Sequence, residues 1–182
     1  SRHRMIKPAL QGEAFLADVR DAGSSQDDLH IWWLGQSGFL VQWRGSHLLF
    51  DPYLSESLSR KYAATDKPHT RMTGLVISPD ALDFIDLTTS SHNHTDHLDG
   101  ETLTALIQAN PKMELLVPLA NRTFAAERLD MDPEQLETID AGQSIALGPF
   151  EVHAVPAAHE DLAKDDLGRH QFVGYVAKLG PW

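Results

Sequence analysis

Three of the ten histidines in the sequence fall within six residues, in the stretch Ser91-His92-Asn93-His94-Thr95-Asp96-His97. Imidazole nitrogens and carboxylate oxygens are donors that bind divalent transition ions in proteins. A bound ion lowers the pKa of its water to about 7, which makes hydroxide available at neutral pH. The stretch therefore predicts one or two divalent ions that activate water. The alternative is a surface histidine cluster without metal.

The spacing inside this stretch divides the donors into two sets. His92 and His94 are two residues apart, so an extended backbone sends both side chains to the same side. Asp96 and His97 are adjacent and would diverge, which suits a neighbouring ion. Two-metal hydrolases hold their ions roughly 3.5–4 Å apart. We therefore expect one ion on the first pair and a second ion on the other.

The first ion needs a further histidine, and three candidates lie downstream. His153 alternates with apolar neighbours in a predicted strand, which favours a place on the strand face or behind a ligand. His159 follows the end of that strand in a loop, where ligands are commonly presented, and is preferred over His153 and His170. Asp51 also follows a strand, so it either caps a turn or orients a ligating imidazole.

The elements that must position these residues follow from hydrophobic periodicity. Short runs rich in aromatic and β-branched residues predict an antiparallel meander that ends at Asp51-Pro52. A buried strand over Phe84–Thr89 leads into the histidines, and Asp99 is the expected N-cap of the helix behind them. This order predicts a mixed α/β domain with helices packed on sheets. The further predicted elements are helices over 8–21 and 122–129 and strands over 29–34, 39–43, 47–50, 113–117, 138–139, 144–147, 150–155 and 172–179.

Residues Tyr53 to Gly74 lack periodicity and predict a loop or short helix over one end of the sheet. His69 and Arg71 in this segment are either contacts for an anionic substrate or solvated loop charges, and the second interpretation is preferred. Gly35-Gln36-Ser37-Gly38 predicts a turn rather than a nucleophile site. Three tryptophans are expected to pack in the core or on a sheet face: Trp32, Trp33 and Trp43.

Composition limits the partners. The chain has 182 residues, a formal net charge of −11 and no cysteine. The acidic balance argues against nucleic acid and anionic membranes as partners, whereas bound dications would still attract an anionic small-molecule substrate. The lack of cysteine excludes thiolate ligands and fits a reducing cytoplasm. We expect a cytoplasmic protein with a small-molecule substrate; a homo-oligomer is compatible with the sequence.

The motif His92-Asn93-His94-Thr95-Asp96-His97 resembles the signature of the metallo-β-lactamase superfamily. Leu48–Pro52 upstream and His159 downstream stand in a similar order. Ile31–Gly35 and Phe150–Ala154 resemble the ascorbate-6-phosphate lactonase-like branch, and a phospholipase D-like branch that hydrolyses N-acylphosphatidylethanolamine has a closely similar histidine motif. The resemblance implies a four-layer αβ/βα sandwich. It also implies two ligand sets: His92, His94 and His159 on the first metal, and Asp96 and His97 on the second.

The family also uses an aspartate that bridges both metals and a late histidine on the second metal, and this sequence contains neither. We therefore expect a single metallo-hydrolase domain over residues 1–182 that is the N-terminal part of a longer protein, with an incomplete sandwich. The segment from Tyr53 to Gly74 differs from the lactonase branch, so the substrate of that branch is not carried over.

These observations predict a metal-dependent hydrolase that attacks an ester-like centre. A lactone or a phosphodiester is preferred over an amide. Asp96 is the expected catalytic residue, as a ligand and a proton acceptor. Zn²⁺ suits the nitrogen and oxygen donors, and Mn²⁺ or Fe²⁺ would also fit. The alternative is a non-catalytic or regulatory metal-binding protein of the same fold. A redox di-iron protein is disfavoured, because it usually has an acidic residue where Asn93-His94 stands.

Overall fold

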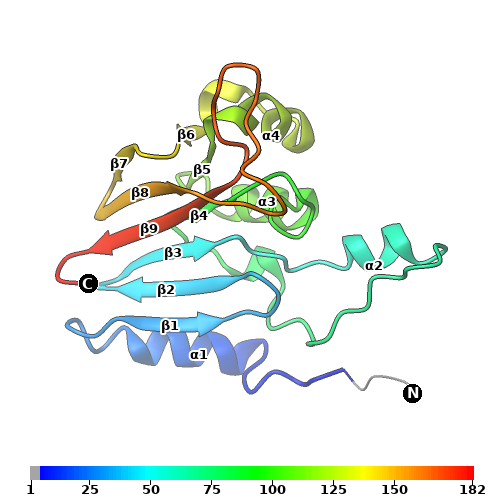
Figure 1. Ribbon diagram of the computed structural model, residues 1–182. Helices are drawn as coiled ribbons and strands as arrows, with labels where there is room; N and C mark the ends of the chain where they lie inside the picture. Colours follow the sequence, from blue (N-terminus) through cyan, green and yellow to red (C-terminus); the bar gives the residue numbers. More distant parts are fainter. Residues whose placement is uncertain (1–4) are drawn as a thin grey trace.

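The computed structural model describes residues 5–182, which form two sheets and their covering helices (Figure 1). The expected mixed α/β fold is confirmed. The six-stranded sheet contains β1 (His30–Trp33), β2 (Phe39–Trp43), β3 (Ser46–Phe50), β4 (Leu87–Thr89), β5 (Glu114–Pro118) and β6 (Glu137–Ile139). The three-stranded sheet contains β7 (Ser144–Leu147), β8 (Phe150–Pro156) and β9 (Val173–Leu179). The helices are α1 (Glu13–Ala22), α2 (Ser57–Tyr62), α3 (Gly100–Ala109) and α4 (Arg122–Leu129), with 3-10 turns η1 (Pro79–Ala81), η2 (Leu119–Asn121) and η3 (Pro133–Gln135).

The six-stranded sheet begins with the predicted antiparallel meander and continues with parallel strands. β1, β2 and β3 pair antiparallel, whereas β3, β4, β5 and β6 pair parallel. Phe50 at the end of β3 is in register with Thr89 at the end of β4. The chain therefore leaves both strands at the same edge, which places Asp51 beside the start of the histidine stretch.

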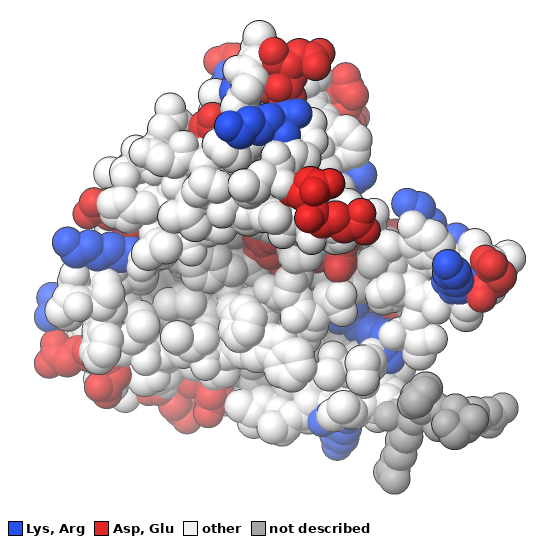
Figure 2. Space-filling view, viewed as in Figure 1, with Lys and Arg blue, Asp and Glu red and all other residues white. Residues whose placement is uncertain are grey.

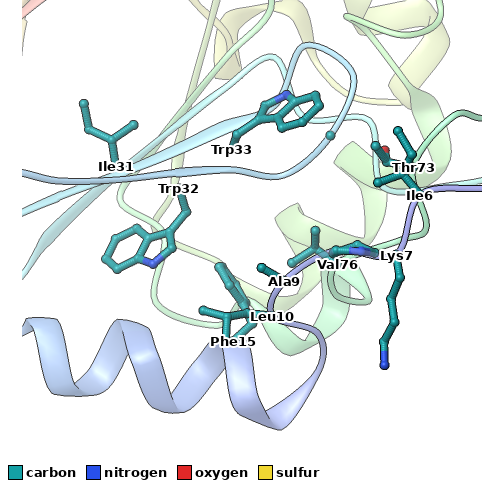
Figure 3. A pocket seen from close by; sticks show the side chains of 12 residues that line it. Ile6, Lys7, Ala9, Leu10, Phe15, Ile31, Trp32, Trp33, Thr73 and Val76 are labelled. Carbon is teal, nitrogen blue, oxygen red and sulfur yellow. The ribbon is translucent and has the colours of Figure 1, made fainter.

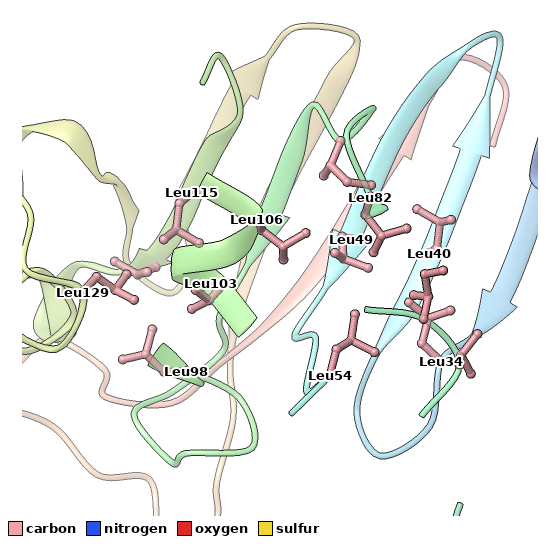
Figure 4. Close-up of a cluster of buried hydrophobic side chains, with 14 of the residues drawn as sticks. Leu34, Leu40, Leu49, Leu54, Leu82, Leu98, Leu103, Leu106, Leu115 and Leu129 are labelled. Atoms are coloured by element: carbon pink, nitrogen blue, oxygen red, sulfur yellow. The ribbon is translucent and has the colours of Figure 1, made fainter. Parts of the chain in front are cut away.

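Two hydrophobic clusters divide the molecule into layers. The first lies between the six-stranded sheet and the helices, where leucines such as Leu49 and Leu115 meet Leu103 and Leu106 of α3 (Figure 4). The second lies between the two sheets and joins residues such as Leu48 to Phe150 and Val152. The described residues thus form three stacked layers, helices, sheet and sheet, which are three of the four layers of the expected sandwich.

Two boundaries differ from the sequence prediction by three residues or more. The first helix begins at Glu13 rather than near Pro8, because Gly12 has a φ of 53° and donates its N–H to the carbonyl of Val76. The strand before the histidines begins at Leu87 rather than Phe84. There the backbone N–H of Ile85 is bound by a side-chain oxygen, Oδ1 of Asn110, instead of a strand partner.

Asp99 is the N-cap of α3, as predicted, and we expect its removal to destabilise the protein by roughly 2 kcal/mol. Its buried carboxylate accepts hydrogen bonds from the backbone and hydroxyl of Thr102, at 3.2 and 2.5 Å, and from the hydroxyl of Ser57 at 2.8 Å. Urea unfolding of Asp99→Ala measures the loss. Asp132→Ala removes an N-cap at an exposed turn and should cost roughly half as much; equal losses would contradict the assignment.

The segment from Tyr53 to Gly74 contains α2 and extends to one side of the molecule (Figure 1). The prediction of a solvated Arg71 is wrong, because this side chain is buried. Its guanidinium donates to the carbonyls of Tyr53 at 3.0 Å and Ser55 at 3.2 Å, and lies 4.8 Å from the centre of the Tyr53 ring. Arg71 therefore joins the two ends of the segment and is not available to a substrate.

Charged side chains lie mainly around the margin of the face shown in Figure 2 and leave its centre largely uncharged. Among the described residues on this face, lysines and arginines form no continuous basic area. This distribution agrees with the net charge of −11. Between residues 5 and 182, no helix has the length and apolar character needed to cross a membrane.

Candidate metal centre

The histidine stretch leaves β4 at the edge of the six-stranded sheet and folds into a compact loop. The N–H groups of His97 and Leu98 both donate to the carbonyl of His94, at 3.0 and 2.8 Å. The hydroxyl of Ser90 donates to the carbonyl of His92 at 2.9 Å. These bonds bend the backbone of the loop, so that the side chains of its histidines point towards one another.

The second sheet brings His159 to the same place. β8 ends at Pro156, paired with Val173 of β9, and the N–H of Val173 donates to the carbonyl of Ser91 at 3.1 Å. The hydroxyl of Tyr175 in β9 donates to the carbonyl of Ser90 at 2.9 Å. These bonds join the two sheets beside the histidine loop, and the loop after β8 carries His159 to it.

Four imidazoles gather at this edge. The ring centres of His92 and His94 are 4.7 Å apart, those of His94 and His159 are 4.6 Å apart, and those of His92 and His159 are 6.1 Å apart. The ring of His97 lies 4.0 Å from that of His92. The structure therefore brings together the three histidines expected on the first ion, with His97 directly beside them.

The donor atoms fit a bound ion. Nδ1 of His92 lies 2.9 Å from the hydroxyl of Ser91, whereas its Nε2 is buried and has no hydrogen-bond partner among the described residues. A buried polar atom without a partner is costly, and its desolvation cost is offset when a metal takes the lone pair. Nε2 of His92 is thus the observation that most directly supports a metal.

The pair expected on the second ion also lies together. Nε2 of His97 is 3.8 Å from Oδ2 of Asp96. Nδ1 of His97 is 2.7 Å from Oδ2 of Asp51, which fixes the ring and leaves Nε2 for a ligand. By distance alone, Asp51, His92 and His97 also form a possible ligand group. We assign Asp51 to orienting His97 instead, because its carboxylate oxygens are already occupied by hydrogen bonds.

Asp51 is the centre of a buried hydrogen-bond network. Oδ1 accepts from the hydroxyl of Thr89 at 2.8 Å, and Oδ2 accepts from the N–H of Ser91 at 3.0 Å and from the Ser91 hydroxyl. The hydroxyl of Ser91 also contacts the rings of His92 and His97. Of the two interpretations of Asp51, the structure therefore favours the one in which it orients an imidazole.

The surroundings shift the pKa values of the two central histidines in opposite directions. Burial, followed by the charges of His97 and His94, lowers the pKa of His92 to about 4, so its ring is neutral at neutral pH. Burial also lowers the pKa of His97, but the hydrogen bond and charge of Asp51 together with Asp96 outweigh it and raise the pKa overall. A neutral His92 is the form that ligates a metal.

We expect the metal-free protein to lose stability as the pH falls from about 6.5 to 4. In this range an unfolded His92 binds a proton and the folded one does not, so His92 contributes its full stability only above the unfolded pKa of 6.5. The contribution of His97 to stability stays constant between pH 6.5 and 4, because a raised pKa changes the stability only above the unfolded pKa of 6.5. His92→Gln should reduce the loss by about 1–2 kcal/mol, which allows for solvent screening.

Urea unfolding at pH 5.0 and 7.5 measures this effect, with His153→Gln as the control. The pKa of His47 is also lowered by burial, so His92→Gln should retain part of the pH dependence. An unchanged pH dependence in His92→Gln would contradict the assignment.

The other candidate residues lie elsewhere. His153 is on the surface of the second sheet, where it contacts Ser144 at 2.6 Å and Glu151 at 3.1 Å. His170 lies 3.2 Å from Asp140, and the ring of His69 packs edge-on against Tyr53. None of the three belongs to the group of converging imidazoles.

Sequence patterns did not identify Phe172, which contacts three of the predicted ligands. Its ring centre is 4.9 Å from that of His92, 5.8 Å from that of His159 and 5.9 Å from that of His94. Its carbonyl accepts the N–H of Ala157 at 3.2 Å, which helps to hold the loop that carries His159. Its sequence signal was its position at the start of the strand predicted over 172–179.

A separate apolar pocket of about 430 Å³ lies between the first residues of the described chain, α1 and β1. Figure 3 shows Trp32 pointing towards Phe15, while Trp33 projects from the opposite side of the strand. Trp32 packs against the core as expected, whereas Trp33 is more than half exposed. None of the residues that line the pocket is a proposed metal ligand, so the pocket is separate from the metal centre.

Helices on one sheet, a second sheet behind it and a His/Asp donor set at their common edge define a protein of the metallo-β-lactamase type. Residues 30–180 match the beta-lactamase superfamily domain, and the chain belongs to that superfamily. The branch within the superfamily stays a prediction.

Individual relatives are more distant. An uncharacterized protein of Mycobacterium tuberculosis is 26% identical over 159 residues, which are 87% of this chain and 41% of the relative. A UPF0173 metal-dependent hydrolase of Rhizobium leguminosarum is 31% identical over 80% of this chain and 54% of its own length. The N-acyl-phosphatidylethanolamine-hydrolyzing phospholipase D 1 of Caenorhabditis elegans is 29% identical over 52% of this chain and 26% of its own. The chain thus spans about half the length of these relatives or less.

Solved structures share the fold. CmlA, a diiron beta-hydroxylase of Streptomyces venezuelae, superposes with a TM-score of 0.55 and 23% identity over 94% of this chain and 31% of its own. Igni18, a metallo hydrolase of Ignicoccus hospitalis, superposes with a TM-score of 0.50 and 16% identity over 83% of this chain and 56% of its own. At these identities the likeness extends to the fold alone.

Proposed function

We propose that this protein is a metal-dependent hydrolase that acts on an ester-like centre, a lactone or a phosphodiester, in a small-molecule substrate. The observation that carries the proposal is the buried Nε2 of His92, which has no hydrogen-bond partner in the described chain and lies among converging imidazoles. Membership of the beta-lactamase superfamily supports it, as does the likeness to the UPF0173 metal-dependent hydrolase. The phosphodiester alternative is supported by the likeness to the phospholipase D.

The residues divide into two groups of ligands. His92, His94 and His159 would hold the first ion, and Asp96 and His97 would contribute to the second. Zn²⁺ suits these donors, and Mn²⁺ or Fe²⁺ would fit as well. When bound, the ions supply hydroxide at neutral pH and stabilise negative charge on the substrate oxygen.

Side chains of the protein orient the ligands and accept the proton released by the attacking water. Asp51 fixes the ring of His97 through Nδ1. Burial alone would raise the pKa of Asp96, but the hydrogen bond from Gln36 and the charge of His97 lower it, so the carboxylate is ionised at neutral pH. We propose that Asp96 is a ligand and receives the proton of the attacking water.

The test combines elemental analysis with a hydrolase panel of lactones, phosphodiesters and β-lactams. We expect at least one equivalent of transition metal, and turnover that is lost on chelation and restored by Zn²⁺ or Mn²⁺. Less than one equivalent, together with activity that resists chelation, would refute the proposal. Stoichiometric metal without turnover on any substrate class would favour the non-catalytic alternative.

A further inference from the structure

The turn between β1 and β2 has a fixed shape. Gly35 has a φ of 87° and Gln36 a φ of 50°, and the N–H of Leu34 donates to the carbonyl of Gly38 at 2.8 Å. A Cβ on Gly35 would lie 2.7 Å from Oγ1 of Thr73, so the turn approaches the neighbouring segment closely. The indole N–H of Trp33 donates to the carbonyl of Gln36 at 3.0 Å. These contacts hold Gln36 in the left-handed region, which glutamine rarely adopts.

Two consecutive residues of this turn contact Asp96. Nε2 of Gln36 donates to Oδ2 of Asp96 at 3.0 Å. The hydroxyl of Ser37 lies 2.9 Å from the carbonyl oxygen of Asp96 and 3.0 Å from that of Asp51. The turn therefore holds the side chain and the main chain of the same aspartate, and Ser37 is engaged as a structural donor.

We propose that Gln36 is a positioning residue that fixes the carboxylate of Asp96 for the second ion; this rests on the proposed function. The N–H of its amide holds Oδ2 of Asp96, which is also 3.8 Å from Nε2 of His97. The amide is neutral, so it orients the carboxylate without reducing the charge offered to a cation. A lysine or arginine in its place would compete with the ion.

The exposure of Gln36 separates this role from a general role in stability. Its side chain is exposed, and an exposed hydrogen bond contributes little to folding because water replaces it. Partners that orient metal ligands, in contrast, typically change metal affinity 10–100-fold when removed. Loss of the amide should therefore change the affinity for the ion more than the stability of the metal-free protein.

The test is calorimetric titration of the metal-free protein with Zn²⁺. Gln36→Met keeps the length of the side chain without the N–H, and Gln36→Asn keeps the amide on a shorter side chain. We expect both variants to bind the second ion roughly 10–100-fold more weakly, with an unchanged affinity for the first ion. The unfolding temperature without metal should not fall in either variant, since asparagine also adopts a positive φ. Gln26→Asn is the control, because Gln26 donates only to the carbonyl of Gly23 within the chain described.

The outcomes separate this inference from the proposed function. If the wild type binds two ions and the Gln36 variants bind them with equal affinity, only this inference is overturned. The same holds if the wild type binds a single ion and the variants match it. A wild type that binds less than one ion overturns both.

Discussion

His92→Ala is expected to lose the first ion and, with it, more than about 100-fold of any hydrolytic activity, because even the outer partners of metal ligands cost 10–100-fold when removed. Nε2 of His92 is the buried donor at the centre of the site, with the rings of His94 and His97 4.7 and 4.0 Å away. Metal content and turnover of the purified variant measure both effects.

His153→Ala is the matched control, because His153 lies on the surface of the second sheet and, among the described residues, its ring nitrogens contact Ser144 and Glu151. It should keep wild-type metal content and turnover. If the two variants retained the same metal, the ligand assignment of His92 would be wrong.

Asp51→Asn is expected to destabilise the metal-free protein by about 2–4 kcal/mol, since hydrogen bonds to charged groups contribute about 1.5–3 kcal/mol each to stability. The buried carboxylate accepts from Thr89, from Ser91 and from Nδ1 of His97. An amide turns its NH₂ group towards some of these donors and leaves them unpaired. Asparagine also tolerates the φ of 37° at this position, so backbone strain does not confuse the result.

Urea unfolding and Zn²⁺ titration would measure the effect of Asp51→Asn, and we expect affinity for Zn²⁺ to fall roughly 10–100-fold. Asp27→Asn is the control: it breaks an exposed ion pair with Arg44 and should change stability by less than about 1 kcal/mol. A stability loss in Asp51→Asn no larger than in the control would show that the network is unimportant.

Much of the fold was predictable because the elements have local signals. The meander from β1 to β3, the β7–β8 hairpin and the N-cap Asp99 all follow from residues within a few positions of one another. The start of α1 was wrong because Gly12 is held by Val76, 64 residues later in the chain. The prediction for Arg71 failed for a similar reason: its partners lie 16 and 18 residues away.

The convergence of the candidate ligands was predictable from the sequence, and their supports only in part. His92, His94, Asp96 and His97 share one short motif, and the structure brings His159 to them. Gln36 lies 60 residues from Asp96, and Asp51 lies 46 from His97. These pairs meet only when β1, β3 and β4 assemble into one sheet. The position of Asp51 after a strand therefore suggested an orienting role without identifying His97, and no local pattern indicated the contact of Gln36.

The short distance between the ends of the segment from Tyr53 to Gly74 has a consequence for protein engineering. Arg71 binds the carbonyls of Tyr53 and Ser55, so the two ends of the segment lie side by side. The residues between Ser55 and Arg71, which include α2, therefore form a loop whose two ends are held together by hydrogen bonds. A graft that retains Tyr53, Ser55 and Arg71 should therefore replace α2 and leave the His/Asp donor set in place.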